Sequence, residues 1–226
     1  RASLADEAWI LDVGLPPLAW NSQLHQAATA HGRDMLSRIY YSHISPEGSG
    51  PMDRIAATGY QAIAEGESLG ALVFSNYVEI EVAVEFLLDS LLRDELTAAP
   101  GTERKIFSST YTELGISLSA ETVTLLADQP YVYLLVIDFA QPMTPRAFIL
   151  GTVGANHRVA MKSYTKDNWD PVEVLPGGAF QVPYPTYGAE FVALDDNWNV
   201  VQSVIVYDFT QSVNRAIDLS VGKTSP

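Results

Sequence analysis

The chain has 226 residues, of which 47% are hydrophobic and 18% charged, a composition typical of a globular protein and not of a disordered one. Its formal net charge is −14, and residues 1–141 carry 19 acidic against 7 basic side chains, which disfavours nucleic acid and anionic lipid as partners. The chain has no cysteine, which excludes disulfides, cysteine–zinc sites and thiol nucleophiles, and no apolar run reaches the ~20 residues of a transmembrane helix.

Two helical segments are predicted near the start of the chain. Residues 4–11 are expected to form a short helix that ends at Gly14. Asn21 or Ser22 is suited to cap a longer helix. Its apolar positions recur with helical spacing and predict one buried face. His31 lies on that face and is expected to be packed and hydrogen-bonded rather than to bind a ligand. These positions are Leu24, Ala27, Ala28, His31, Met35 and Ile39.

Two further helices are predicted before the first strong strand signal. Pro51 suits the first turn of a helix that ends just before Gly59, a residue that fits the position after a helix terminus. Ser75 or Asn76 is expected to cap a fourth helix, which runs to about Leu92 and carries an acidic, solvated face. The inward positions of this fourth helix are predicted to be Val78, Val82, Phe86 and Leu87.

Strand signals dominate after residue 110. Leu114, Ile116 and Leu118 alternate with small or polar neighbours, which is the pattern of a half-buried strand. Tyr131–Phe139 is almost continuously apolar and predicts a central strand. Helices followed by strands that must pack between them favour an α/β/α layered arrangement.

A second domain is predicted after a proline-containing linker, Gln141–Pro145. The expected boundaries are 1–141 for the first domain and 142–226 for the linker and second domain. Two oxygen-rich loops, Asp167–Asp170 and Asp195–Asn199, do not fit an EF-hand and are interpreted as turns rather than calcium sites. Six short strand-like runs predict a small β-sandwich, namely residues 147–153, 158–164, 179–182, 189–195, 200–207 and 213–219.

Three polar positions have side chains suited to chemistry. His43 follows a helix in a polar loop, and Glu113 lies where a strand begins. Glu67 is next to Gly66, which lets the backbone turn or approach a neighbour closely. A histidine with carboxylates can bind a divalent metal or transfer protons, and it can equally form a hydrogen-bonded network without a ligand. A serine hydrolase is disfavoured, because no Gly-x-Ser-x-Gly elbow is present.

Five motifs occur in order along the chain: Gly14–Asn21, Trp20–Arg38, Ser42–Gly48, Gly66–Ser68 and Tyr111–Ile116. This ordered set resembles the CAP superfamily, whose SCP-like members include cysteine-rich secretory proteins, venom antigens and plant pathogenesis-related proteins. The resemblance covers residues 8–139, and the lack of cysteine points to the bacterial branch. It implies an α-β-α sandwich, an extracellular or envelope location, and a cleft lined by two histidines and two acidic residues.

The resemblance assigns cleft roles to five positions. His43 matches the first histidine of the family, Glu67 the first acid and Glu113 the second acid. Thr102 stands where the family has its second histidine, and Ser68 stands where it usually has asparagine. A neutral hydroxyl is a weak ligand for the cation that the two imidazoles would hold. The resemblance thus implies a degenerate site, in which zinc, magnesium or calcium could bind only through His43, Glu67 and Glu113.

The resulting expectation is an exported, non-enzymatic module that binds a small molecule, a lipid or a protein through the His/Glu cleft. No catalytic residue is assigned. Two alternatives stay open at this point: a divalent-metal-dependent hydrolase acting on peptide or lipid, and a structural interaction protein of the cell envelope. No signal peptide is visible, but the sequence opens at Arg1 rather than Met, so we expect that such a leader has been removed or precedes the given sequence.

Overall fold

The computed structural model describes residues 14–99, 102–124, 126, 128–185, 187–207 and 213–220, and the helix predicted at residues 4–11 lies outside them. Within the described chain there are two compact units, one containing residues 20–144 and the other containing residues 16–19 and 145–220. No described helix has the length and apolar character needed to cross a membrane.

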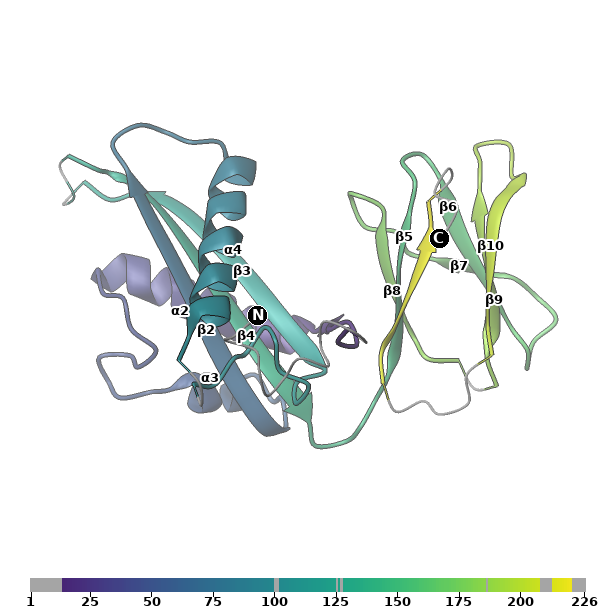
Figure 1. Ribbon diagram of the computed structural model, residues 1–226, viewed down its shortest axis with the longest axis horizontal. Helices are drawn as coiled ribbons and strands as arrows, with labels where there is room; N and C mark the ends of the chain where they lie inside the picture. Colours follow the sequence, from purple (N-terminus) through teal and green to yellow (C-terminus); the bar gives the residue numbers. More distant parts are fainter. Residues whose placement is uncertain are drawn as a thin grey trace. The chain divides into compact units, whose positions relative to one another are not determined.

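The first unit is built on a four-stranded sheet with helices on both faces, as predicted (Figure 1). Strand β4 (Tyr131–Pro142) lies between β2 (Ala62–Phe74) and β3 (Glu113–Thr122) and pairs antiparallel with both. The short β1 (Ala19–Trp20) extends the sheet beside β3. The helices are α2 (Ser22–Arg38), α3 (Pro51–Ala57) and α4 (Ile80–Thr97).

Helix α2 forms where the sequence pattern predicts it. The Asn21 side-chain oxygen accepts hydrogen bonds from the backbone N–H groups of the second and third residues after it, at 2.9 and 3.2 Å, and so caps the helix. Its buried face, which includes Met35, packs against Leu134 and Val136 of β4. Ile39 does not belong to that face, because the helix ends there in a left-handed turn (φ 54°) that leaves this side chain 48% exposed.

Helix α4 differs from its prediction in both start and orientation. It begins at Ile80, and its buried residues are Ala83, Leu87 and Leu91. Val82 and Phe86, which were expected to face inward, are 41% and 57% exposed. The helix carries apolar residues on more than one side, so periodicity alone could not identify the face that packs on the sheet.

Strand β2 was not predicted from the sequence. Its residues include two glycines, a serine and several alanines, which have little strand propensity of their own. The strand is held by its antiparallel ladder to β4, which runs from Ala62 opposite Pro142 to Phe74 opposite Tyr131. This ladder places Glu67 in the sheet rather than in a loop. It also shows that β4 continues into the first residues of the predicted linker.

The second unit is a β-sandwich, in agreement with the predicted fold class. One sheet has the order β10-β9-β6-β7 and the other the order β11-β5-β8. Side chains such as Ile149 and Phe180 from the second sheet pack against Phe191 from the first in one apolar core. The strands are β5 (Phe148–Val153), β6 (Arg158–Ser163), β7 (Asp170–Val172), β8 (Ala179–Pro183), β9 (Ala189–Leu194), β10 (Val200–Val206) and β11 (Arg215–Leu219).

Candidate functional site

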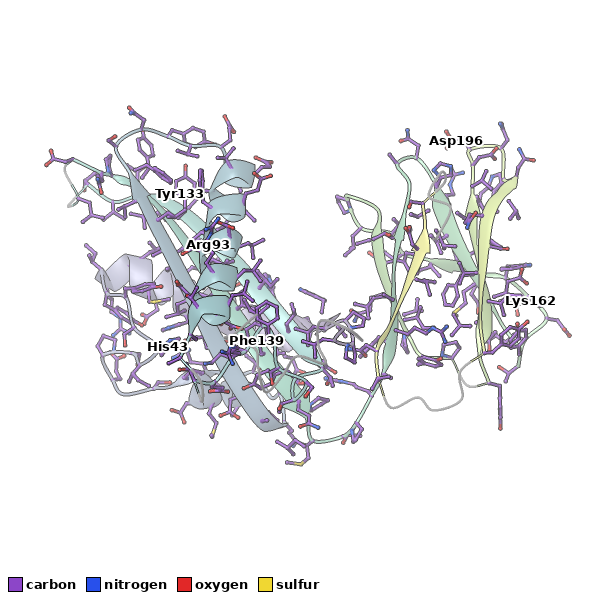
Figure 2. All side chains as sticks on the ribbon, in the orientation of Figure 1. His43, Arg93, Tyr133, Phe139, Lys162 and Asp196 are labelled. Atoms are coloured by element: carbon purple, nitrogen blue, oxygen red, sulfur yellow. The ribbon has the colours of Figure 1, made fainter. Side chains whose placement is uncertain are left out.

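A polar pocket of about 230 Å³ lies in the first unit, where the loop after α2 and the start of α3 meet strand β2. His43 lies at this pocket, beside α3 (Figure 2). The lining residues are His43, Gly50, Pro51, Met52, Glu65, Gly66, Glu67, Glu103 and Lys105. The structure therefore brings His43 and Glu67 together, although they lie 24 positions apart in the sequence.

Glu67 is the most constrained residue of the pocket. Its side chain has no solvent exposure, and both carboxylate oxygens are engaged. Oε1 lies 2.7 Å from Nδ1 of His43, and Oε2 accepts a hydrogen bond of 2.6 Å from Nη2 of Arg54. A buried charge needs this kind of charged, hydrogen-bonded partner, because its desolvation is otherwise costly.

Arg54 also fastens the loop that carries His43. Its Nη1 donates to the carbonyl oxygens of His43 at 3.0 Å and of Ser49 at 2.9 Å. One guanidinium group thereby joins α3, the loop and β2. Sequence reasoning did not identify this residue, because nothing in the local pattern around position 54 distinguishes it from a solvated helix arginine.

A second imidazole approaches Glu67 from the interior of α2. His31 is 1% exposed, as expected for a packed histidine, and its Nε2 lies 3.0 Å from the carbonyl oxygen of Ser42 and 3.9 Å from Glu67 Oε1. Burial lowers the pKa of His31, against the opposing charge of Glu67, so the ring is neutral at neutral pH. The proton then resides on Nε2, which donates to Ser42.

Asp138 completes the buried group. It lies opposite Glu67 in the ladder between β4 and β2 and is completely buried. Burial first, and then the charge of Glu67, raise the pKa of Asp138 to about 8, although Arg54 acts in the other direction. The site thus contains two facing carboxyls, of which Asp138 keeps its proton at neutral pH.

Replacing Asp138 by asparagine is expected to flatten the dependence of stability on pH. An unfolded aspartate releases its proton near pH 3.8, whereas folded Asp138 holds it to about pH 8. The native state therefore binds more protons between these values, and the free energy of unfolding falls as pH rises through them. The free energy of unfolding by urea is measured for both proteins at pH 5 and at pH 8. At pH 8 the Asp138→Asn protein should be more stable than the parent by roughly 1–3 kcal/mol. Parallel pH profiles for the two proteins would contradict this.

The other three residues assigned by resemblance lie away from the pocket lining. Glu113 is on β3, across β4 from Glu67, where its Oε2 accepts hydrogen bonds from Asn21 Nδ2 at 2.8 Å and from the Tyr60 hydroxyl at 3.1 Å. Ser68 follows Glu67 on β2, so its side chain points to the opposite face of the sheet.

Thr102 is exposed and does not line the pocket, whereas Glu103 and Lys105 from the same segment do. The Tyr111 hydroxyl donates to Glu103 Oε1 at 2.7 Å and lies 3.1 Å from the Glu65 carbonyl oxygen. The hydrogen bond from Tyr111, and then the charge of Lys105, lower the pKa of Glu103 and keep it ionised.

The donor set around Glu67 does not fit a divalent metal. Such a cation needs several converging, unprotonated ligands, and here Arg54 and His43 already use both oxygens of the carboxylate. Within the part of the chain that the structure describes, no group of three or more histidine, aspartate or glutamate side chains is arranged to hold an ion. The positive charge beside Glu67 is supplied by the guanidinium of Arg54.

Comparison with known proteins gives one family match. The profile of the cysteine-rich secretory protein family (CAP) matches residues 11–125. An extracellular SCP-domain protein from Bacillus anthracis is 22% identical, with a TM-score of 0.38 over 59% of this chain and 36% of that one. This chain therefore spans little more than a third of that protein's length.

Two further solved structures are similar at lower identity. An outer surface protein from Borrelia burgdorferi is 16% identical, with a TM-score of 0.41 over 62% of this chain and 88% of that one. An oligosaccharyltransferase from Archaeoglobus fulgidus is 14% identical, with a TM-score of 0.23 over 71% of this chain and 21% of that one. No curated protein sequence matches.

Proposed function

This chain belongs to the cysteine-rich secretory protein (CAP) family, and from that premise we propose that it is an exported, non-enzymatic module that binds a basic group of a ligand or partner protein in the pocket beside Glu67. The observation that carries the proposal is the engagement of Glu67, the acid that matches the family motif. Arg54 and His43 hold both of its oxygens. The residue is thereby committed to organising the pocket rather than to reacting.

The pocket chemistry supports binding over hydrolysis. A general base must reach the proton that it removes, and the Glu67 side chain has no solvent exposure. None of the described side chains that line the pocket is a hydroxyl or thiol nucleophile. The donor set also fails to fit the cation that would polarise water in a metal-dependent hydrolase.

The charge of the pocket supports a basic ligand. Three glutamates and one lysine line it. Arg54, which is not among the lining residues, offsets the negative charge of one of these glutamates, Glu67. Glu103 is ionised and positioned by Tyr111 at the rim, where its side chain is 63% exposed. The strongly acidic composition of residues 1–141 adds long-range attraction for a cationic group.

Tetralysine is expected to bind the protein measurably and tetraglutamate is not. Calorimetric titration at low salt should give saturable tetralysine binding that weakens as ionic strength rises, because the interaction is largely electrostatic. Glu103→Gln should lower the affinity about threefold or more, since it removes one exposed charge of the pocket. The matched control is Glu121→Gln, which removes an exposed carboxylate at the end of β3 and should leave the affinity unchanged.

Two results would contradict the proposed function. One is an equal affinity for tetralysine in the Glu103→Gln variant and the parent. The other is metal-dependent cleavage of casein or p-nitrophenyl butyrate that disappears in a His43→Ala variant, which would restore the hydrolase alternative.

A further inference from the structure

Part of the outer face of one sheet in the second unit is apolar, although the outer face of a β-sandwich is usually polar. Phe191 and Ala193 of β9 point into the core, so the alternate residues Val192 and Leu194 point outward. These two are only 3% and 8% exposed. With Ala160 of β6 they form a separate apolar cluster on this face.

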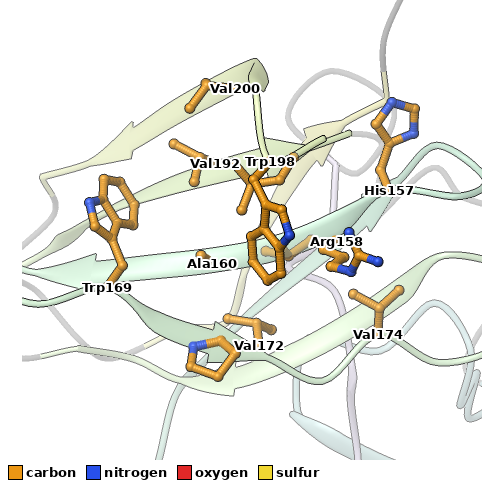
Figure 3. Close-up of a pocket in the computed structure, with 12 residues that line it drawn as sticks. His157, Arg158, Ala160, Trp169, Val172, Val174, Val192, Trp198 and Val200 are labelled. Atoms are coloured by element: carbon orange, nitrogen blue, oxygen red, sulfur yellow. The ribbon is translucent and has the colours of Figure 1, made fainter. Parts of the chain in front are cut away.

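A groove of about 610 Å³ lies over this cluster, within the usual size range of ligand sites. Figure 3 shows Trp169 at one end of the groove, His157 and Arg158 at the other, and Trp198 between them. Trp169 and Trp198 are 42% and 67% exposed. The remaining lining residues are all alanine, proline, leucine or valine.

Trp198 is held in place before any ligand arrives. The preceding Asp195 carboxylate accepts the backbone N–H groups of Asn197 at 2.9 Å and Asn199 at 2.8 Å, which fixes the turn that carries the indole. Trp198 has a positive φ of 66°, which is rare for so large a side chain. The Arg158 guanidinium lies 4.9 Å from the centre of its ring. Such preorganisation lowers the entropic cost of binding.

The polar side chains of the groove are almost all hydrogen-bond donors. The indoles of Trp169 and Trp198 and the guanidinium of Arg158 donate and cannot accept. His157 has its Nδ1 2.9 Å from the Ala155 carbonyl oxygen. Because Nδ1 donates there, Nε2 of His157 is left as an acceptor, and a matching ligand is apolar and carries more acceptors than donors. Asp196 lies 3.9 Å from the Arg158 guanidinium and offsets part of its charge, which weakens the attraction of the groove for a carboxylate.

From this combination we propose that the groove binds a proline-rich segment of a partner protein in the polyproline II conformation. Proline has no N–H group, so such a segment presents apolar rings and carbonyl acceptors and few donors. Its rings can stack on the two indoles while its carbonyls accept from the indole and guanidinium N–H groups. Polyproline II segments are recognised by aromatic-lined grooves because they are already extended and lose little entropy on binding. A sugar chain fits less well, since its many hydroxyls would require more acceptors than the Nε2 atom of His157 supplies.

The test is a titration of the whole protein with decaproline, followed by calorimetry, with a glycine–serine peptide of equal length as the negative control. Decaproline is expected to bind saturably, and Trp198→Ala and Trp169→Ala should each weaken binding at least tenfold. The matched control is Trp20→Ala, which removes a tryptophan that is 50% exposed in the first unit and should leave binding unchanged. Thermal unfolding of each variant shows whether the sandwich remains folded.

Several outcomes would overturn the inference. The inference is contradicted if decaproline binding does not saturate. It is also contradicted if the Trp198→Ala and Trp169→Ala variants bind decaproline with the same affinity as the parent. Trp198-dependent binding of cellohexaose or dodecanoate in place of decaproline contradicts it as well, since the groove would then be a sugar or lipid site. Dimerisation of the protein that is lost in Trp198→Ala would assign the groove to a second copy of this chain.

Discussion

A Gly115→Ala protein is expected to lose the folded first unit under conditions where the parent is stable. A Cβ atom at this position would lie 2.0 Å from the backbone nitrogen of His25 and 2.2 Å from the carbonyl carbon of Leu24. These are backbone atoms of α2, so no side-chain rotation can relieve the overlap. The helix would have to move off the sheet, at a cost of about 3 kcal/mol or more. That is a large share of the roughly 5–15 kcal/mol that stabilises a typical domain.

Urea unfolding followed by circular dichroism measures this loss, and Gly48→Ala provides the control. Gly48 has a φ of +88°, but nothing lies within 4 Å of its added Cβ. The expected cost there is about 1–2 kcal/mol, from backbone conformation alone. If Gly115→Ala lowers the free energy of unfolding by no more than Gly48→Ala does, the result contradicts the close approach of α2 to β3 at this position.

Arg54→Ala is expected to be the most damaging substitution at the polar pocket. It leaves the Glu67 charge buried without its cation and removes the donors of two loop carbonyls. Removing one partner of a buried ion pair costs about 3–5 kcal/mol, and the Arg54 side chain is only 11% exposed. Chemical denaturation at pH 7 should therefore show a clearly lower midpoint with an unchanged slope.

Arg38→Ala is the matched control for a loss of charge alone. Arg38 also contacts two carboxylates, Asp34 and Glu47, but does so at the surface, where ion pairs contribute little. Its replacement should cause only a small fraction of the Arg54 effect. Equal effects at both positions would show that the buried contacts of Arg54 have no special role.

Much of the secondary structure could be predicted because its determinants are local. The Asn21 cap and the periodic apolar face predict α2, and the observed helix runs from Ser22 to Arg38. The apolar run at Tyr131 predicts the central strand, and most strands of the sandwich lie within one or two residues of their predicted ends. The failures have a common origin. Strand β2 is stabilised by its partner, and the buried face of α4 is selected by the sheet on which it packs.

The candidate site shows the same limit. The motifs identify His43 and Glu67, and the fold does bring these two together. The motifs do not reveal that Arg54 is the counter-ion of Glu67, nor that Asp138 faces it. Glu113 has the residue type that the family resemblance implies, but strand order places it across β4 with Asn21 and Tyr60.

The sequence by itself therefore determined the family, the α-β-α and β-sandwich classes, and the residue types available for binding, since each is encoded in composition, short motifs or local periodicity. The tertiary structure alone decided which charged groups are buried next to one another and which indoles flank one groove. Those outcomes depend on the register of β2 against β4, on the docking of α3, and on the turns that carry the tryptophans. Electrostatic energies depend on distance and burial, and neither quantity is encoded in any short stretch of chain.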